Sequence, residues 1–327
     1  MTKPVFKPNA LDLTTGLFVI INLVAIIASW QTMDNPWLVF GVYASCLITG
    51  LVAMRINRLE AWEQSPSFLK KIAATLFLIL RLGYPLIYML FFFVGVTEFQ
   101  HLFFPEVLDP QFIAFDQALF GYLPVKQWMV WYDGYLISEV LHGAYFIYYL
   151  LLGILPLGLF FKDPKILERY LFAVMLVFYA SALTYLVFPV AGGRYLPELK
   201  ELTETLRHGP FTKLMALAYQ TSSHFGAAFP STHVAMSLVM VAGSWSYARK
   251  TAPLFILNAI LVMIATVFCG YHYVADVLGA IVYVGVLYPL GLRLHQRISS
   301  GLLVPGSPRK SDPSLHPQIS SEGDTGL

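Results

Sequence analysis

Two histidines are the residues of this chain with the clearest potential for chemistry. One of them, His272, has a carboxylate, Asp276, four residues after it. Residues four apart lie on the same face of a helix, so Asp276 can accept a hydrogen bond from one ring nitrogen of His272. The other nitrogen then keeps its lone pair directed outward, as a nucleophile or a base requires. The spacing therefore predicts a histidine nucleophile that is oriented by an aspartate.

The second histidine, His233, follows residues that predict an anion site. Pro230 fixes the start of a helix, and Ser231 is a good N-cap residue. We therefore expect the backbone amides of Ser231, Thr232 and His233 to face an anion at the helix N-terminus. We interpret this segment as a phosphate cradle that contains a histidine.

A cation for the same phosphate stands in a third segment, residues 191–195, which reads Ala-Gly-Gly-Arg-Tyr. Gly192 and Gly193 permit close approach of the backbone, and Arg194 can bind phosphate oxygens through two parallel hydrogen bonds. Tyr195 is a candidate for the lining of the substrate cavity. The three segments together predict a site for a phosphate group.

The composition of the chain indicates an integral membrane protein. Of 327 residues, 57% are hydrophobic and 12% are charged, whereas soluble domains carry about 25% charged residues. A net charge of +2, with Lys and Arg scattered between apolar segments, argues against a nucleic-acid partner, because phosphate backbones are bound by concentrated basic residues. The cysteines, Cys46 and Cys269, lie far apart in apolar segments and predict neither a disulfide nor a thiolate metal site.

Eight segments are apolar and long enough to cross the bilayer, which takes about 20 residues of helix. All should be helical, because unpaired backbone groups cannot face lipid. The predicted fold class is therefore all-α, a polytopic membrane protein of about eight transmembrane helices. The predicted spans are 11–31, 37–54, 72–97, 135–161, 168–190, 231–248, 252–269 and 274–294.

Basic residues in the short loops predict the orientation, because Lys and Arg favour the cytoplasmic side. With eight spans, every basic cluster falls on one side, so both termini are expected in the cytoplasm and the connections 98–134 and 191–230 outside. His233 and His272 then meet the same outer interface. The clusters contain Lys3, Lys7, Arg55, Arg58, Lys70, Lys71, Lys162, Lys165, Arg169, Arg249, Lys250, Arg293, Arg297, Arg309 and Lys310.

Each candidate segment has an ordinary explanation when it is taken alone. A His-x-x-x-Asp pattern is weak, Gly-Gly-Arg is common in loops, and Phe-Pro-Ser-Thr is an ordinary helix start. An interfacial histidine is more often solvated than catalytic. Three such segments at the outer ends of successive spans favour an active site over a coincidence.

The connections outside the spans differ in character. Residues 98–134 mix aromatic side chains with a few charges, which predicts helices in the headgroup plane, either as a passive anchor or as a lid. Residues 191–230 form the predicted active-site loop. Residues 298–327 are rich in Ser, Pro and Gly and are expected to form a disordered cytoplasmic tail.

Residues 192–195, 229–233 and 270–276 resemble the three motifs of the type 2 phosphatidic acid phosphatase superfamily, which also includes vanadium haloperoxidases and sphingolipid synthases. The resemblance covers the last six spans. It implies a six-helix catalytic domain at 72–297, preceded by two accessory helices and a basic cytoplasmic loop at 1–71. Within the superfamily, two segments look most like the inositol phosphorylceramide synthase (inositolphosphotransferase) branch. They are Phe115-Asp116-Gln117-Ala118-Leu119-Phe120-Gly121 and the Tyr148-Tyr149 pair.

The resemblance implies a role for each motif residue. His272 would be the nucleophile that becomes phosphorylated, Asp276 its orienting partner and His233 the acid that protonates the leaving oxygen. Arg194 would hold the phosphate, and no cofactor is expected. A zinc site built from His233, His272 and Asp276 is conceivable, but the spacing is not that of a hydrolytic zinc motif, so we expect no metal.

Two departures from the phosphatase pattern bear on the substrate. Phosphatases of the superfamily usually carry an Arg where this chain has Thr266, and a Lys where it has Val187. A dianionic monoester is best held by several cations, whereas a diester carries one negative charge. The site is thus better balanced for a diester, unless the loop supplies further charge from Lys200, Arg207, His208, Lys213 or His224.

Three other ionisable residues lie within the spans. Glu139 and His142, three residues apart near an outer helix end, could line the substrate cavity or form a satisfied interhelical pair. For Arg81 we favour a structural role.

The sequence predicts an enzyme that moves a phospho-headgroup between lipids through a phosphohistidine intermediate at the outer membrane face. Its partners would be a phospholipid or lipid phosphate substrate and the bilayer. The alternative is a phosphatase acting on lipid phosphates or diphosphates, with water as the acceptor. A non-catalytic lipid transporter is a third possibility, but it would more naturally show paired repeats with broken helices.

Overall fold

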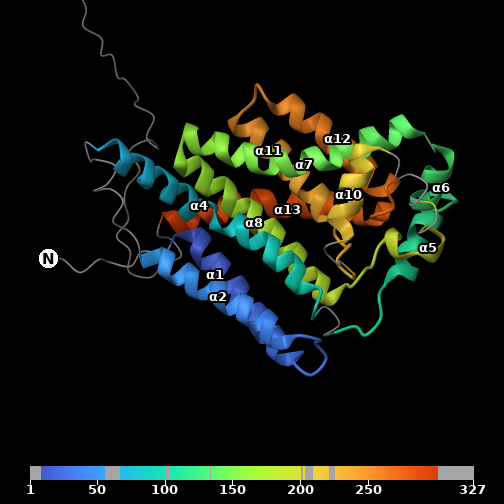
Figure 1. Ribbon diagram of the computed structural model, residues 1–327, viewed down its shortest axis with the longest axis horizontal. Helices are drawn as coiled ribbons and strands as arrows, with labels where there is room; N and C mark the ends of the chain where they lie inside the picture. The colour runs from blue at the N-terminus through green and yellow to red at the C-terminus, as the bar shows by residue number, and fades with distance from the viewer. Residues whose placement is uncertain are drawn as a thin grey trace, which may run out of the picture.

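The protein is a bundle of helices, as its computed structural model shows (Figure 1). The structure describes residues 9–55, 67–99, 103–132, 134–199, 202, 209–220 and 225–300. Within these residues there is no β-strand, only one isolated parallel bridge between Val190 and Ala227. The helices are α1 (Ala10–Ala28), α2 (Pro36–Arg55), α4 (Phe68–Val96), α5 (Asp109–Phe120), α6 (Pro124–Trp131), α7 (Tyr135–Lys162), α8 (Pro164–Val187), the 3-10 turn η2 (Gly193–Tyr195), α10 (Pro210–Gln220), α11 (Thr232–Tyr247), α12 (Ala252–Phe268) and α13 (Val274–Ser299).

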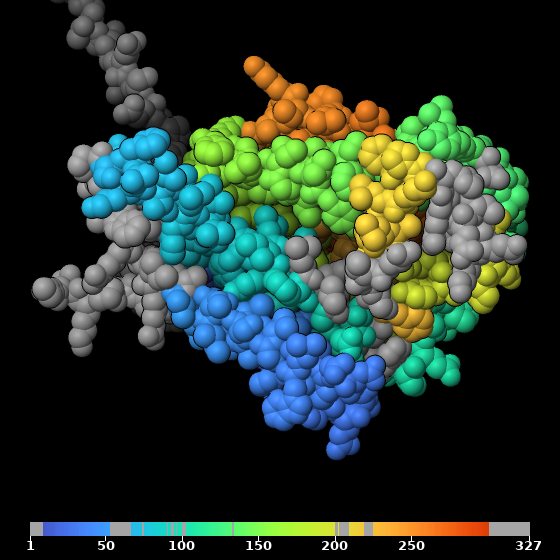
Figure 2. Space-filling model, in the orientation of Figure 1, coloured from blue at the N-terminus to red at the C-terminus, as the bar shows by residue number. Residues whose placement is uncertain are grey.

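Helix α8 is the centre of the bundle. It packs against α1, α4, α7, α11 and α13, and most of its side chains are buried. Among them are large aromatic residues that are almost fully enclosed, namely Tyr170, Phe172, Phe178 and Tyr185. Seen from one face, α7 and α10 lie in front with α12 above them, and α1 and α2 lie together along the opposite edge (Figure 2).

Among the described residues, five helices are long and apolar enough to cross a membrane: α1, the Phe68–Met89 part of α4, α7, α8 and α13. Shorter apolar helices cover Pro36–Val52 and α12. Exposed apolar side chains on these helices, such as Leu17, Val24 and Ile27 of α1, suit a lipid-facing surface. The expected fold class, an all-α membrane protein, is confirmed, while the number of spans stays a prediction.

The eight predicted spans all fall on helices, with shifted ends. Helix α8 begins at Pro164 instead of residue 168, because the Asp163 carboxylate caps it by accepting from the Lys165 amide at 2.8 Å. Helix α13 continues to Ser299, so its last two residues fall within the segment predicted as a tail, 298–327. Residues 301–327 lie outside the described residues. The same holds for five basic residues used to predict the orientation: Lys3, Lys7, Arg58, Arg309 and Lys310.

The first helix is attached to the core by a buried ion pair. Both guanidinium nitrogens of Arg81 in α4 bind the carboxylate of Asp12 in α1, at 2.8 and 2.5 Å, and Tyr84 donates to the same carboxylate. Tyr179 of α8 donates to Thr15 at 2.9 Å. Arg81 therefore has the structural role expected for it.

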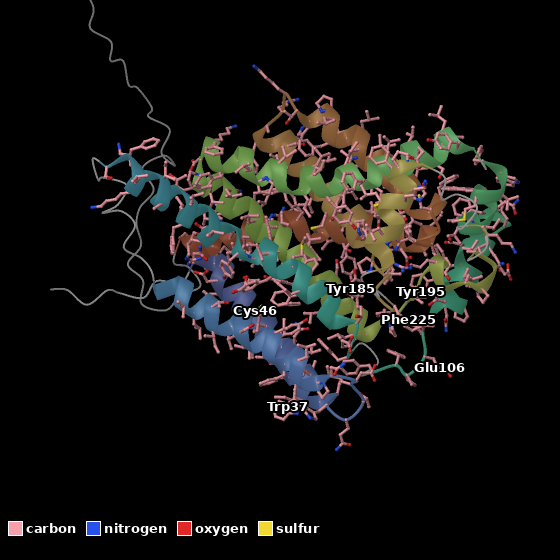
Figure 3. All side chains as sticks on the ribbon, viewed as in Figure 1. Trp37, Cys46, Glu106, Tyr185, Tyr195 and Phe225 are labelled. Atoms are coloured by element: carbon pink, nitrogen blue, oxygen red, sulfur yellow. The ribbon has the colours of Figure 1, made fainter. Side chains whose placement is uncertain are left out.

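The connections predicted to lie outside contain short helices at one end of the bundle (Figure 1). Residues 98–134 form α5 and α6, and the described part of 191–230 contains η2 and α10. At this end, α5 packs against the start of α13, α6 against α12, and α10 against α7. The same end carries Tyr195 and Phe225, whose ring centroids are 5.0 Å apart (Figure 3).

Candidate active site

His272 and Asp276 form the hydrogen bond that their spacing predicts. Nδ1 of His272 lies 3.2 Å from Oδ2 of Asp276, and the two side chains are 8% and 0% exposed. The geometry differs from the expected one in one respect. His272 precedes α13, which begins at Val274, so Asp276 in the first turn reaches back to the histidine and also accepts from the Tyr273 amide at 2.9 Å. The pair therefore does not lie on one helix face.

A carboxylate from another helix fixes the start of α13. Asp116 of α5 accepts from the amides of Val274 at 2.8 Å and Ala275 at 3.0 Å. Burial raises the pKa of the Asp116 carboxyl, and the two amide hydrogen bonds oppose this rise. Because free amides at a helix N-terminus need acceptors, Asp116 specifies where the helix after His272 begins.

The loop that carries His272 is held by backbone contacts. The amides of Tyr271 and His272 donate to the carbonyl of Thr266, at 3.0 and 2.9 Å. A Cβ on Gly192, which has φ of 89°, would lie 2.4 Å from the Tyr271 carbonyl, and one on Gly193 would lie 2.9 Å from the Gly270 carbonyl. The two glycines thus allow the arginine segment to lie directly against the histidine loop.

Asp109, at the start of α5, joins the same two segments through its side chain. Its carboxylate accepts from the amides of Ala191 at 2.7 Å and Gly192 at 2.9 Å. It also accepts from the hydroxyl of Tyr273 at 2.8 Å. One buried carboxylate therefore binds the backbone before Arg194 and the residue after His272.

The His233 segment is attached to both of the others. Val190 donates to the Gly226 carbonyl at 3.1 Å and accepts from the Ala228 amide at 2.8 Å. The Ser231 amide donates to the Asp276 carbonyl at 3.2 Å. Three segments far apart in the sequence are thus joined into one site, two of them through the Asp109 carboxylate and the third by these backbone hydrogen bonds.

The predicted phosphate cradle is partly wrong. Ser231 is the N-cap of α11, as expected, and its hydroxyl accepts from the Val234 amide at 3.4 Å. Its own amide, however, donates to the Asp276 carbonyl and does not face a ligand. The amides of Thr232 and His233 lie in the first turn of α11, where backbone N–H groups can face an anion.

His233 lies inside a group of tyrosines from α7. The hydroxyl of Tyr149 is 2.9 Å from Nε2 of His233, and the ring centroids of Tyr145 and Tyr148 are 4.6 and 5.3 Å from the histidine ring. The rings of His233 and His272 are 6.2 Å apart between centroids. At this separation both histidines can contact one phosphoryl group.

Arg194 lies in the 3-10 turn η2, two residues after Gly192. Its guanidinium carbon is 5.0 Å from the centroid of the Tyr195 ring, a distance typical of a cation–π contact. The contacts of Gly192 and Gly193 bring the turn that carries Arg194 directly against the His272 loop.

Glu139 and His142 have different hydrogen-bond partners. The Glu139 carboxylate accepts from the amides of Phe211 at 2.9 Å and Thr212 at 3.0 Å, so it caps α10. It also lines a cavity between α7, α10 and α12. His142 donates from Nδ1 to the Ser138 carbonyl at 2.8 Å, and its ring is 6.4 Å from that of Tyr271.

Most of the loop residues that could supplement the charge of Arg194 are not described. Lys200, Arg207, His208 and His224 lie outside the described residues. In the part of the chain that the structure describes, no group of three His, Cys, Asp or Glu side chains is arranged to hold a metal ion. Both cysteines are buried and unlinked.

Three residues of the site had no assigned role in the sequence: Asp109, Asp116 and Tyr149. Asp116 and Tyr149 fall in the segments that resemble the inositolphosphotransferase branch, and this resemblance could have indicated a role for them. Asp109 gave only the sign of a helix start, an acidic residue before Pro110. Their partners are between 82 and 164 residues away, which no local spacing indicates.

The comparisons with known proteins agree with the motifs. A family model described as the PAP2 superfamily matches residues 110–290, which is more than half of the chain and includes Arg194, both histidines and Asp276. No curated protein and no solved structure matches the chain. The prediction of a type 2 phosphatidic acid phosphatase fold is confirmed at the level of the superfamily, and the chain belongs to the PAP2 superfamily.

Proposed function

We propose that the protein is a membrane lipid phosphotransferase that moves a phospho-headgroup from one lipid to the hydroxyl of another. The observation that carries the proposal is the His272–Asp276 pair with the His233 ring 6.2 Å from that of His272. Superfamily membership supports phosphatase or phosphotransferase chemistry on lipid phosphates. The transferase activity and the inositolphosphotransferase-like branch are our more specific proposal.

In the first step, His272 attacks the phosphorus of the donor lipid. Asp276 occupies Nδ1, so the lone pair of Nε2 forms the new N–P bond. The P–O bond to the lipid breaks, its electron pair goes to the leaving oxygen, and His233 gives that oxygen a proton. The phospho-headgroup is then held on His272, and a lipid alcohol leaves.

In the second step, the hydroxyl of the acceptor lipid attacks the same phosphorus. His233, now neutral, takes the hydroxyl proton as the new O–P bond forms and the N–P bond breaks. Arg194 and the amides of Thr232 and His233 stabilise the negative charge that develops on the phosphoryl oxygens in both steps. The hydroxyl of Tyr149 keeps the His233 ring oriented.

The charges around the phosphate favour a diester over a monoester. Thr266 and Val187 are neutral residues at the positions where the phosphatases usually carry Arg and Lys. Thr266 is fully buried, and its hydroxyl donates to the Met263 carbonyl. Lys126 of α6, which lies at the same end of the bundle, forms an ion pair with Glu198. Among the described residues assigned to the phosphate, Arg194 is the cation, and its single charge balances the one charge of a diester better than the two of a monoester.

The site is proposed to face the extracytoplasmic side. The support is the distribution of Lys and Arg, which places the basic loops on the side opposite to His233 and His272. An outer-leaflet lipid would then reach the site from the bilayer without crossing the membrane.

A phosphatase that acts on lipid phosphates or diphosphates is the second candidate, and the match to the PAP2 superfamily favours it. It would use the same residues, with water in place of the acceptor hydroxyl. A transporter would show no turnover at all.

The test is a product analysis of the purified protein. It is incubated with phospholipid diesters or phosphatidic acid, with and without a lipid alcohol, and the products are identified by mass spectrometry. We expect faster turnover of the diester and formation of a new lipid only when the alcohol is present, with His272→Ala as the inactive control. A strong preference for phosphatidic acid, with free phosphate as product, would overturn the transferase proposal and support the phosphatase.

A further inference from the structure

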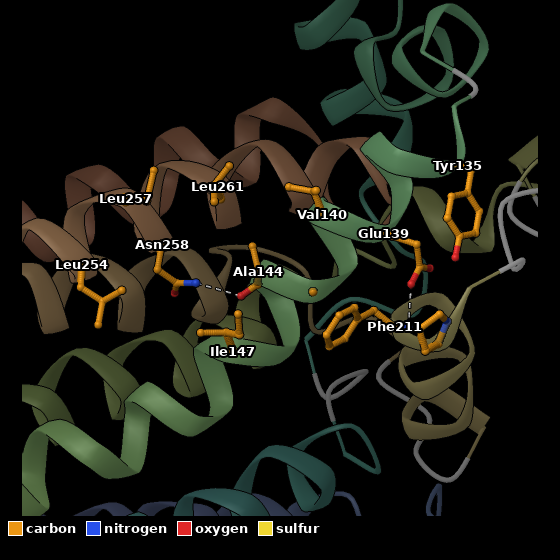
Figure 4. Close-up of a pocket in the computed structure, with 12 residues that line it drawn as sticks. Tyr135, Glu139, Val140, Ala144, Ile147, Phe211, Leu254, Leu257, Asn258 and Leu261 are labelled. Carbon is orange, nitrogen blue, oxygen red and sulfur yellow. Dashed lines mark hydrogen bonds between the residues drawn. The ribbon is translucent and has the colours of Figure 1, made fainter.

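The cavity that Glu139 lines lies on the side of α7 that faces α12 (Figure 4). Its volume is about 420 Å³, in the range of small-molecule binding sites. Apolar side chains make most of its wall, and Leu254, Leu257 and Leu261 form one face of α12 along it. Glu139 stands at one end, where its carboxylate binds the amides of α10.

This cavity is separate from the phosphate site. On α7, Val140, Ala144 and Ile147 follow a helical spacing and line the cavity. Tyr145 and Tyr149, which contact His233, belong to other positions around the helix. Helix α7 therefore has the phosphate site on one side and the apolar cavity on another.

One polar atom in the cavity wall has no partner. Asn258 of α12 is 5% exposed, and its amide nitrogen donates to the Ala144 carbonyl at 2.9 Å. Among the described residues, nothing donates to the Oδ1 of Asn258. The orientation of the amide is fixed, because the Ala144 carbonyl can only accept. A buried acceptor without a donor is unfavourable, so the cavity presents a place for a hydrogen-bond donor.

The surroundings indicate what kind of molecule brings the donor. Leu254 and Leu257 are 53% and 57% exposed on an apolar helix, so the cavity opens toward the bilayer. Hydrocarbon holds no water to satisfy the amide, and a charged donor is costly there. A neutral lipid with a hydroxyl group supplies both the apolar chain and the donor.

We propose that this cavity is an accessory site for a lipid alcohol, whose chain lies along the α12 leucines and whose hydroxyl donates to Oδ1 of Asn258. The choice of an alcohol rests on the proposed function, because headgroup transfer releases one lipid alcohol and consumes another. The site would hold such a lipid next to the bundle without taking part in the chemistry at His272.

Photolabelling in lipid vesicles tests the hydrogen bond directly. Two probes are compared on the unaltered protein, a long-chain alcohol carrying a diazirine and the methyl ether of the same alcohol, which cannot donate. We expect the alcohol to label peptides around 140–147 and 254–261 about five- to tenfold more than the ether, the effect of one hydrogen bond. Excess unlabelled alcohol should compete.

A matched pair of variants locates the effect. Asn258→Leu should remove the difference between the probes. Asn22→Leu is the control, because Asn22 is also a buried asparagine whose amide donates to a helix carbonyl, that of Phe18, but it lies in α1. This variant should keep the difference. Thermal unfolding shows whether each variant is folded.

The outcomes separate this proposal from the proposed function. Equal labelling of 140–147 and 254–261 by both probes, or an unchanged difference in Asn258→Leu, would overturn the accessory site. Preferential alcohol labelling together with a lack of lipid turnover would overturn the phosphotransferase function and leave the lipid site standing.

Discussion

The hydrogen bond between Asp109 and Tyr273 gives a quantitative test of how the site is assembled. Tyr273→Phe removes one donor, at 2.8 Å from the carboxylate, and leaves the ring in place. Burial raises the pKa of the Tyr273 hydroxyl, which therefore remains a donor throughout the physiological pH range. The substitution changes only the contact that joins the residue after His272 to α5.

The size of the effect follows from the type of bond. A hydrogen bond to a charged group contributes about 1.5–3 kcal/mol. We expect Tyr273→Phe to lower the free energy of unfolding by about this amount, and the turnover to fall about tenfold, since a loss of about 1.4 kcal/mol in transition-state stabilisation is a factor of ten. Asp109→Asn weakens all three bonds of the carboxylate and should cost more.

A double-mutant cycle isolates the pair. In the Tyr273→Phe background, Asp109→Asn no longer weakens the bond to the tyrosine hydroxyl, so its cost should fall by about 1 kcal/mol, the difference between a hydrogen bond to a charged group and a neutral one. The assays are lipid turnover by mass spectrometry and thermal unfolding of the four proteins. If the free-energy changes of the two single variants add up to that of the double variant within about 0.5 kcal/mol, the two residues act independently. That result would contradict the role of the Asp109–Tyr273 hydrogen bond.

Three further predictions address the nucleophile, the glycine contact and the topology. His272→Ala should abolish turnover, while Asp276→Asn should leave a small activity, because loss of orientation is less damaging than loss of the attacking atom; a retained rate in the alanine variant would contradict this. Gly192→Ala should destabilise the protein by more than about 2 kcal/mol, because the added Cβ meets a carbonyl at 2.4 Å at a φ of 89°, and an unchanged unfolding temperature would contradict this. A cysteine at Lys213 should react with an impermeant thiol reagent outside intact cells and one at Lys250 should not; the opposite labelling would place the site in the cytoplasm.

The helices could be predicted because bilayer length and apolar composition determine them. The ends were less predictable, since they depend on individual caps such as Asp163 before α8 and Asp116 before α13. The first of these caps is local and visible in the sequence. The second comes from a residue 158 positions away, so no pattern around Val274 could indicate it.

The candidate site was predictable where the chemistry depends on near neighbours in the chain. The His272–Asp276 bond and the Ser231 cap follow from spacings of four and three residues. The use of the Ser231 amide by Asp276 could not be foreseen, because it arises when two distant segments meet. The partners of Glu139 could not be foreseen for the same reason, since they are backbone amides of α10, 72 and 73 positions away.

In the proposed mechanism, His272 holds a phospho-headgroup during turnover. Rapid quenching of the enzyme with a phospholipid diester, followed by mass spectrometry of its peptides at neutral or alkaline pH, tests it directly. We expect the peptide containing His272 to gain the mass of the phospho-headgroup, a lipid alcohol to discharge it, and His272→Ala to show no such adduct. Turnover without an adduct on His272, or with an adduct on another residue, would contradict the mechanism.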